Sequence, residues 1–224
     1  MALSDYFIRL YDKAKSKSTG YEDKWIVEEH DQNATMTHLE VKAKGTFLGF
    51  NQDLVKGVKD TTTRMSSKLE DKDCDGIAFL QDKSKQEHLV FAELKSNFDI
   101  DKIRKAFHQI TMSYIKMHAW LSICKNYNPT NISIHFITAC KRCKDEADIM
   151  LRIAQSQQLE GDSFETKFLK PLLQNHTIKV KLSKFEIIKQ LPFNDIISDK
   201  EIIMYLQLTN KPEDAQTSVS LVES

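Results

Sequence analysis

Residues 88–95 (HLVFAELK) are apolar on both faces of a β-strand, which strongly constrains the fold around them. Successive side chains of a strand point to opposite sides, so Leu89 and Phe91 share one face while Val90 and Leu94 share the other. A strand that is apolar on both sides is typical of the centre of a sheet covered by helices. The sequence therefore predicts a central strand here, with helices packed on the sheet.

A second apolar run and a long amphipathic segment flank this strand. Residues 74–80 (CDGIAFL) and the polar turn at 81–87 precede it, which predicts an antiparallel hairpin. Residues 99–125 follow it and repeat apolar side chains at the helical period. The apolar run 132–139 comes next, and the order strand, helix, strand indicates a parallel pair. The predicted fold class is α/β, a mixed central β-sheet flanked by helices.

The sequence pattern of the C-terminal part predicts further helices and a strand outside this core. Segments 145–159 and 164–174 have helical patterns, and 176–185 alternates as an outer strand. The last residues, 211–224, are mostly polar and are predicted to form a disordered tail. Since the chain has 224 residues, we predict one domain over 1–210.

The charge of the chain is balanced, with 32 Lys and Arg against 32 Asp and Glu. Balance excludes nucleic-acid binding by bulk positive charge, but it permits a local basic patch. Two clusters are predicted to contact phosphates: Lys102, Arg104 and Lys105 at the start of the long helix, and Lys141 and Arg142 further along. The alternative for each cluster is an ordinary solvated surface.

Neither secretion nor a membrane partner is expected. The N-terminal residues are charged throughout, without the apolar stretch of a signal peptide. The longest uncharged apolar stretches, such as 132–140, are too short to cross a bilayer. Four cysteines are too few for a disulfide scaffold. These features predict a cytoplasmic protein.

Charged residues interrupt the otherwise apolar central strand. Glu93 and Lys95 are two residues apart and project from one face, and the hairpin can bring Asp75 beside them. Two converging carboxylates repel each other unless a divalent cation lies between them, and a neighbouring lysine can orient or activate a water. This is the minimum set for metal-assisted attack on a phosphodiester.

Ordinary interpretations of the same residues stay open. Asp75 precedes Gly76 and is also suited to a turn at the start of a strand. Glu93 and Lys95 also fit a surface ion pair on an edge strand, which contributes little stability. Asp73 is an alternative to Asp75 as the acid of the cluster.

The segments CDGIAF (74–79) and AELK (92–95) resemble the PD-(D/E)xK nuclease superfamily, which has the restriction-endonuclease-like fold. The resemblance covers a core of about 50–140. It implies a core built from a helix, three antiparallel strands, a second helix and a parallel strand. The C-terminal helices and strand would be additions to that core.

The resemblance also implies roles for individual residues. Asp75 and Glu93 would hold Mg²⁺ or Mn²⁺, and Lys95 would serve the attacking water. Gln109, on the helix after the strand, would complete the catalytic set. Many members carry a further acid on the first core helix, and Glu29, Glu40 and Glu70 stay open as candidates because spacing does not choose among them.

The function that the resemblance implies is a Mg²⁺-dependent nuclease hydrolysing phosphodiester bonds of DNA, in restriction, phage defence or repair. Two alternatives stand beside it. One is a non-catalytic subunit of the same fold in a larger complex, and the other is an unrelated α/β binding protein. The expected partner is nucleic acid, with a second copy of the chain or a partner subunit as further candidates.

Overall fold

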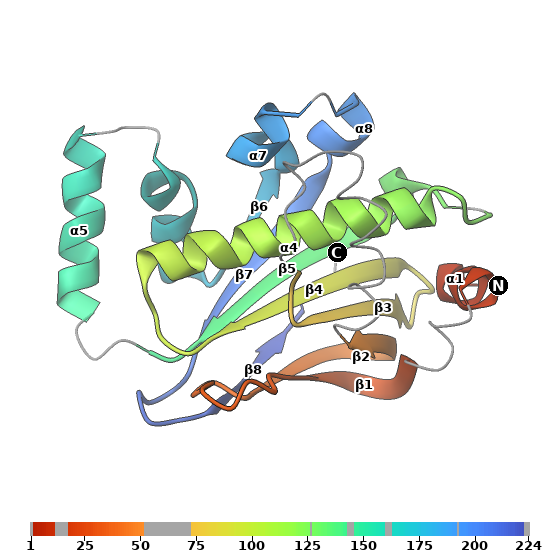
Figure 1. Ribbon diagram of the computed structural model, residues 1–224, viewed down its shortest axis with the longest axis horizontal. Coiled ribbons are helices and arrows are strands. Elements are labelled where there is room, and N and C mark those ends of the chain that lie inside the picture. The colour runs from red at the N-terminus through yellow and green to blue at the C-terminus, as the bar shows by residue number, and fades with distance from the viewer. Residues whose placement is uncertain are drawn as a thin grey trace.

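The computed structural model contains, within its described residues, one mixed sheet of eight strands with α4 lying along one face (Figure 1). The described residues are 2–11, 18–51, 73–125, 127–142, 146–159, 163–191 and 193–221. None of the helices in these ranges is both long enough and apolar enough to span a membrane. The predicted class, α/β with a mixed sheet flanked by helices, is confirmed.

The sheet combines an antiparallel half with a parallel centre. Its strands are β1 (Ser18–Glu28), β2 (His38–Asn51), β3 (Gly76–Asp82), β4 (Glu87–Lys95), β5 (Ser133–Cys140), β6 (Thr177–Lys181), β7 (Glu201–Leu208) and β8 (Gln216–Ser220). The order is β1-β2-β3-β4-β5-β7-β6, and β8 pairs with β2. Strands β1 to β4 are antiparallel, whereas β4, β5 and β7 run parallel. The predicted β3–β4 hairpin and the predicted parallel pair β4–β5 are therefore present.

One helix dominates the face that positions the site. The helices are α1 (Leu3–Leu10), α4 (Ile100–Leu121), α5 (Glu146–Leu159), α6 (Lys170–Asn175), α7 (Glu186–Lys189) and α8 (Asp195–Ser198), with the short turns η1 (Pro129–Asn131), η2 (Glu165–Leu169) and η3 (Leu182–Lys184). The Asp99 side chain caps α4 by accepting a hydrogen bond from the Lys102 N–H. The Tyr114 ring of α4 lies 5.9 Å from the Phe91 ring of β4. This helix therefore covers the Leu89 and Phe91 face of the central strand.

The second face of β4 packs against other strands of the same sheet. Val90 and Leu94 belong to a second core with Trp25 of β1, Val41 of β2 and Val219 of β8. The β1–β2 ladder changes register between Glu22 and Lys24, and such irregularities bend a ladder. In Figure 1, β1, β2 and β8 lie below the central strands, on the side away from α4.

The expectation of a disordered tail over 211–224 is wrong for its centre. Gln216–Ser220 forms β8, whose backbone pairs in parallel with His38–Lys42 of β2. Only Val219 of this strand is buried, so the strand is mostly polar although its backbone pairs with β2. Backbone pairing of this kind does not depend on side-chain polarity.

Candidate active site

The start of β3 and the end of β4 bring two carboxyl groups face to face. Gly76 is paired with Ala92, so the antiparallel register places Asp75 opposite Glu93 on the α4 face. The Asp75 N–H donates to Glu93 Oε2 at 3.1 Å, and the Leu94 N–H donates to Asp75 Oδ2 at 2.7 Å. Asp75 is 7% exposed and Glu93 is 2% exposed. The two acids therefore form a buried, hydrogen-bonded pair.

Lys95 joins this pair and links it to α4. Its Nζ contacts Glu93 Oε1, as expected for residues two apart on a strand. The same Nζ donates to Gln109 Oε1 at 2.9 Å. Gln109 Nε2 in turn donates to the Asp73 carbonyl at 3.3 Å. Asp75, Glu93, Lys95 and Gln109 thus lie in one cluster, which we call the carboxylate cluster.

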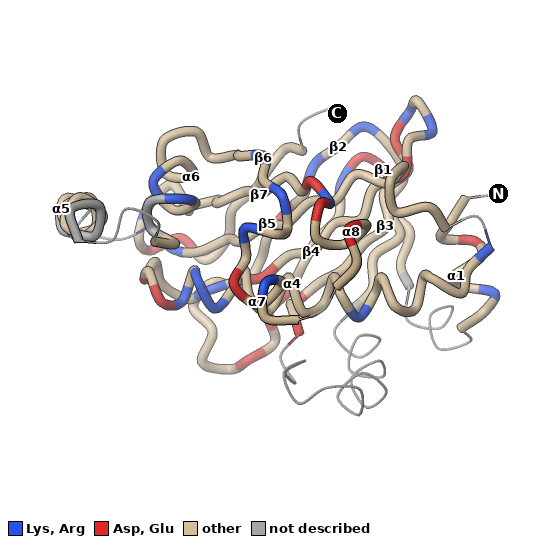
Figure 2. Tube along the Cα trace, turned by 90° about the horizontal axis from the view of Figure 1, so that it is seen from above, with Lys and Arg blue, Asp and Glu red and all other residues tan. Residues whose placement is uncertain are grey.

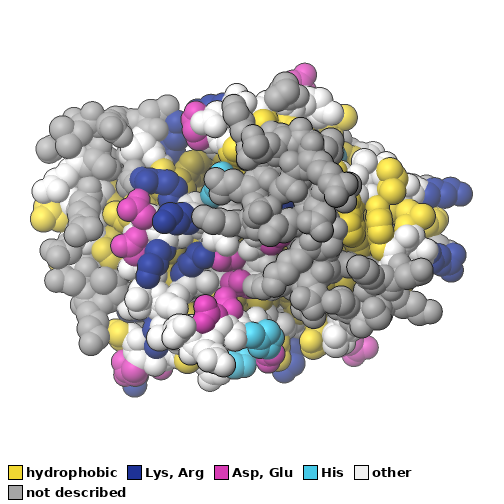
Figure 3. Space-filling view, in the orientation of Figure 1, with side chains coloured by type: hydrophobic (Ala, Val, Ile, Leu, Met, Phe, Trp, Pro, Cys, Tyr) yellow, Lys and Arg dark blue, Asp and Glu magenta, His cyan; other side chains and the backbone are white. Residues whose placement is uncertain are grey.

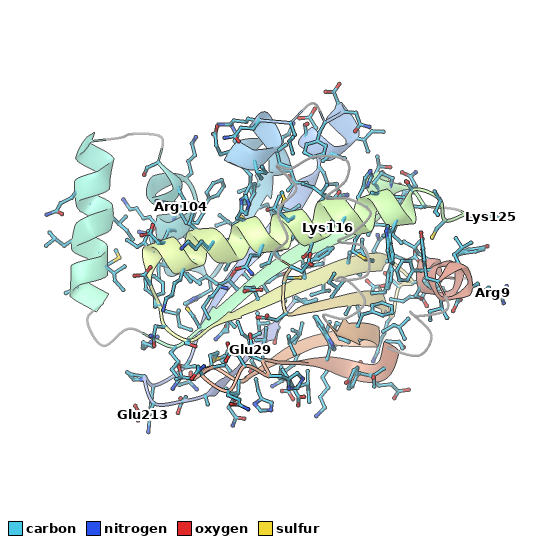
Figure 4. All side chains as sticks on the ribbon, in the orientation of Figure 1. Arg9, Glu29, Arg104, Lys116, Lys125 and Glu213 are labelled. Atoms are coloured by element: carbon cyan, nitrogen blue, oxygen red, sulfur yellow. The ribbon has the colours of Figure 1, made fainter. Side chains whose placement is uncertain are left out.

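A polar stripe on α4 holds the segment before β3 in place. Gln109, Ser113 and Lys116 are spaced four and three residues apart, which puts them on one side of the helix. Ser113 Oγ accepts from the Cys74 N–H at 2.9 Å, and Lys116 Nζ lies 2.7 Å from Asp73 Oδ1. Figure 4 labels Lys116 on α4. Asp73 therefore forms a buried ion pair with the helix, while Asp75 is the acid that meets Glu93.

The electrostatics of the cluster are unfavourable for ionised Glu93. Burial raises the pKa of the Glu93 carboxyl to about 8, and the charge of Asp75 acts in the same direction. Lys95 opposes this shift, and the more distant Glu29 adds to it. A buried acid with a second acid beside it favours its neutral form, so a cation bound between them would release this repulsion.

The donor set fits a hard divalent cation. Mg²⁺ and Mn²⁺ prefer oxygen ligands, and Mg²⁺ commonly binds through one or two carboxylates while keeping several waters. Across the part of the chain that the structure describes, no group of three or more His, Cys, Asp or Glu side chains is arranged to hold a metal. Asp75 and Glu93 match the smaller set that Mg²⁺ requires.

An orphaned hydroxyl beside Glu93 adds to that fit. Thr138 of β5 is the register neighbour of Glu93 and is fully buried. Its Oγ1 has no hydrogen-bond partner among the described residues. A buried polar atom without a partner is uncommon in folded proteins. This oxygen would be satisfied by a water of a bound ion.

The candidates for a further acid differ in their position relative to Glu93. Glu40 lies on β2 and pairs with Lys42 at 2.9 Å and Lys24 at 3.6 Å, so its carboxylate is engaged at another surface. Glu29 follows β1, and its charge acts on Glu93. It lies below α4 in Figure 4. Glu70 is outside the described residues.

The predicted basic residues lie near the end of the sheet where β4 and β5 finish. Lys102, Arg104 and Lys105 are exposed on the first turns of α4. The Phe98 N–H donates to the Lys141 carbonyl at 3.1 Å, which ties the β4–α4 connection to the end of β5. Arg142 follows and is exposed. Figure 3 shows Lys and Arg side chains gathered over the first half of α4.

Sequence reasoning missed Lys116 and Thr138. Lys116 is charged yet falls among buried residues of α4, and its spacing from Gln109 was the available signal. Thr138 lies in an apolar strand, where a hydroxyl is unremarkable until the register with Glu93 is known. Neither the protein-family models, the curated proteins nor the solved structures compared with this chain give a match.

Proposed function

We propose that the protein is a metal-dependent nuclease that hydrolyses phosphodiester bonds of DNA. The observation that carries the proposal is the convergence of Asp75, Glu93 and Lys95 in one buried cluster on the α4 face. A buried acid whose pKa is raised beside a second acid, with a lysine in contact, is typical of sites built for catalysis.

The residues have distinct roles in this proposal. Asp75 and Glu93 hold Mg²⁺ or Mn²⁺, which when bound supplies an activated water and neutralises charge developing on the phosphate. Lys95 orients the attacking water through Nζ. Gln109 holds that Nζ in place by its 2.9 Å hydrogen bond. Lysine and glutamine thus fix the geometry of attack, which is a large part of the catalysis of phosphoryl transfer.

The element order gives further support for a restriction-endonuclease-like core. The resemblance implies a helix, antiparallel strands, a second helix and a parallel strand. Strands β3 and β4, helix α4 and strand β5 follow in that order inside the 50–140 range. Helix α1 and the antiparallel strands β1 and β2 precede that range. Asp75 directly precedes β3, and Glu93 lies near the end of β4.

The direct test is cleavage of supercoiled plasmid DNA with Mg²⁺, with Mn²⁺ and with EDTA. We expect cleavage only with metal, and a decrease of roughly 10²–10⁴-fold in Lys95→Met and in Glu93→Gln. The matched control is Lys125→Met, which removes an exposed lysine just beyond the other end of α4 (Figure 4). Cleavage that persists in both site variants, or that needs no metal, would overturn the proposal.

A further inference from the structure

A cavity that none of the carboxylate-cluster residues lines opens on the other side of α4. It has a volume of about 500 Å³ and lies between α4, the η2–α6 segment and the η3–α7 segment. Ligand sites for small molecules fall in the range of roughly 300–1,000 Å³. The cavity is therefore large enough to take one nucleotide.

The charge lining this cavity is predominantly positive. Among the described residues, Arg104, Lys167, Lys184 and Lys189 line the cavity with one carboxylate, Glu186, which lies 3.6 Å from Lys189 Nζ. Arg104 also forms an ion pair of 3.0 Å with Asp101 on the first turn of α4. Because the chain as a whole is neutral, this excess of cations over acids is local. Figure 2 shows Lys and Arg along the first turns of α4 and on α6.

The larger cavity on the opposite face provides a contrast. It has a volume of about 720 Å³ and is lined by Lys24, Lys42, Lys44 and Lys83. Three acids line it as well, Glu22, Asp23 and Asp82. Its charges nearly balance, so it lacks the bias toward an anion that the α4 cavity has.

Aromatic rings form the floor of the α4 cavity. The Phe164 and Phe168 ring centroids are 5.4 Å apart, and Phe168 stacks on Phe185 at 5.1 Å. The Arg104 guanidinium lies 5.6 Å from the Phe164 centroid. Aromatic faces beside lysines and an arginine are what single-stranded nucleic acids bind, since bases stack on the rings while phosphates meet the cations.

The cavity and the carboxylate cluster share one turn of α4. Phe107 and His108 line the cavity, and the next residue, Gln109, bonds Lys95. The cavity and the carboxylate cluster therefore flank the same turn of α4, and a nucleic-acid strand that reaches from one to the other has to pass over this turn. The larger cavity, by contrast, is lined by Leu80, His88 and His135 on the other face of the sheet.

We propose that this cavity binds one unpaired nucleotide of the substrate strand next to the bond that is cleaved. The base stacks against Phe164, and the adjoining phosphates contact Lys167 and Lys184. This inference rests on the proposed nuclease function and adds that the strand is single or locally unpaired at this point. Stacking and phosphate contacts of this kind do not select a sequence.

Binding is measured by fluorescence anisotropy with a short labelled thymidine oligonucleotide, in EDTA so that no cleavage occurs. Phe164→Leu keeps an apolar side chain but removes the ring, and we expect binding about tenfold weaker. Lys167→Glu with Lys184→Glu should weaken binding and reduce the salt slope by roughly 0.7 for each phosphate that the variant no longer neutralises. Lys125→Glu, beyond the far end of α4, is the matched charge control and should leave the slope unchanged.

An abasic version of the oligonucleotide isolates the stacking. The unchanged protein should bind it about as weakly as Phe164→Leu binds the complete strand. Equal affinity of the unchanged protein for abasic and complete strands would overturn the proposal. Equally strong competition by poly-glutamate would also overturn it, because the cavity would then be a general anion site or a site for an acidic protein.

The outcomes separate this inference from the proposed function. Unchanged binding in folded Phe164→Leu and in the double lysine variant, together with metal-dependent cleavage, would refute the nucleotide site and leave the nuclease standing. If these variants bound more weakly but the unchanged protein did not cleave DNA, the nucleotide site would stand and the nuclease function would be refuted. Thermal melting of each variant checks that the fold is retained.

Discussion

The two faces of the central strands each bury a polar cluster, and the clusters are organised in opposite ways. On the α4 face, Asp75 and Glu93 oppose each other beside Lys95. On the other face, four side chains form a chain that we call the histidine chain: Asp82, His88, His135 and Tyr205. His88 lies 3.4 Å from Asp82 and 3.0 Å from His135, and His135 lies 3.1 Å from the Tyr205 hydroxyl.

The histidine chain is satisfied while both rings stay neutral. The Tyr205 hydroxyl donates to His135 Nδ1, His135 Nε2–H donates to His88 Nδ1, and His88 Nε2–H donates to Asp82, which is a consistent set of tautomers. Burial lowers the pKa of His135 to about 3, and His88 acts in the same direction. Such a network specifies packing and holds the β3–β4 turn.

The contrast separates a cluster that is complete without a ligand from one that we propose binds a metal. In the histidine chain each ring nitrogen contacts a partner, and no charge of either ring is needed. In the carboxylate cluster, burial and the neighbouring acid raise the pKa of Glu93 to about 8. Unrelieved repulsion between buried acids costs stability, and a cation is the ligand that would remove it. Rising pH should therefore destabilise the carboxylate cluster, and falling pH should destabilise the histidine chain.

The largest expected effect on stability is that of breaking the ion pair that anchors the carboxylate cluster. Lys116 is fully buried, and its partner Asp73 is 5% exposed in its side chain. Lys116→Met leaves the Asp73 charge without this lysine, and we expect a decrease of about 3–5 kcal/mol in the free energy of unfolding. Denaturant titration measures this decrease.

The same experiment has two internal controls. Lys116→Met combined with Asp73→Asn should recover much of the stability, because no unpaired buried charge is left. Lys125→Met, at an exposed position, should change stability by less than about 0.5 kcal/mol. If Lys116→Met alone were as stable as the unchanged protein, the ion pair between Lys116 and Asp73 would not contribute to stability.

Local patterns were enough to predict the centre of the fold. The β3–β4 hairpin and α4 follow from strong periodicity over neighbouring residues. The meeting of Asp75, Glu93 and Lys95 follows from two rules, same-face spacing on a strand and antiparallel pairing. Gln109 was reached only through the resemblance, and its contact with Lys95 depends on how α4 crosses the sheet.

The remainder depends on contacts between distant residues. In Gln216–Ser220 only Val219 is buried in the core. The composition of this segment therefore does not predict a strand, although its backbone pairs with β2. Residues 18–24 have the polar composition of a loop but belong to β1, which is defined by its ladder with β2. The His88–His135 contact joins residues on β4 and β5, and only the parallel register brings them together.

The second prediction uses the pH dependence of the carboxylate cluster in metal-free protein. The pKa of Glu93 is raised, so its contribution is fully present below about pH 4.5 and is lost as pH rises through about 8. We expect the stability of the protein in EDTA to fall by about 4 kcal/mol across this window relative to Glu93→Gln. Urea titrations at several pH values compare the two proteins, and parallel curves would contradict the shift.

The third prediction has the opposite sign and concerns the histidine chain. The pKa of His135 is lowered, so its contribution is present above about pH 6.5 and is lost as pH falls toward about 3. His135→Gln should be less stable than the unchanged protein near neutral pH, and the difference should narrow by about 2–3 kcal/mol near pH 4.5. A difference that stays constant with pH would mean that His135 is not held neutral.

The smallest effect separates positioning within the carboxylate cluster from general support by α4. Gln109→Leu removes the acceptor of Lys95 Nζ with little change of volume, and we expect cleavage to fall by about tenfold, the value of a hydrogen bond of roughly 1.5 kcal/mol to a charged group. Ser113→Ala is the matched control, since it removes a bond from α4 to the Cys74 N–H but does not touch Lys95. Both variants should be less stable by about 1 kcal/mol, whereas only Gln109→Leu should be less active. Equal decreases of cleavage in the two would mean that Gln109 acts through the placement of α4 and not through Lys95.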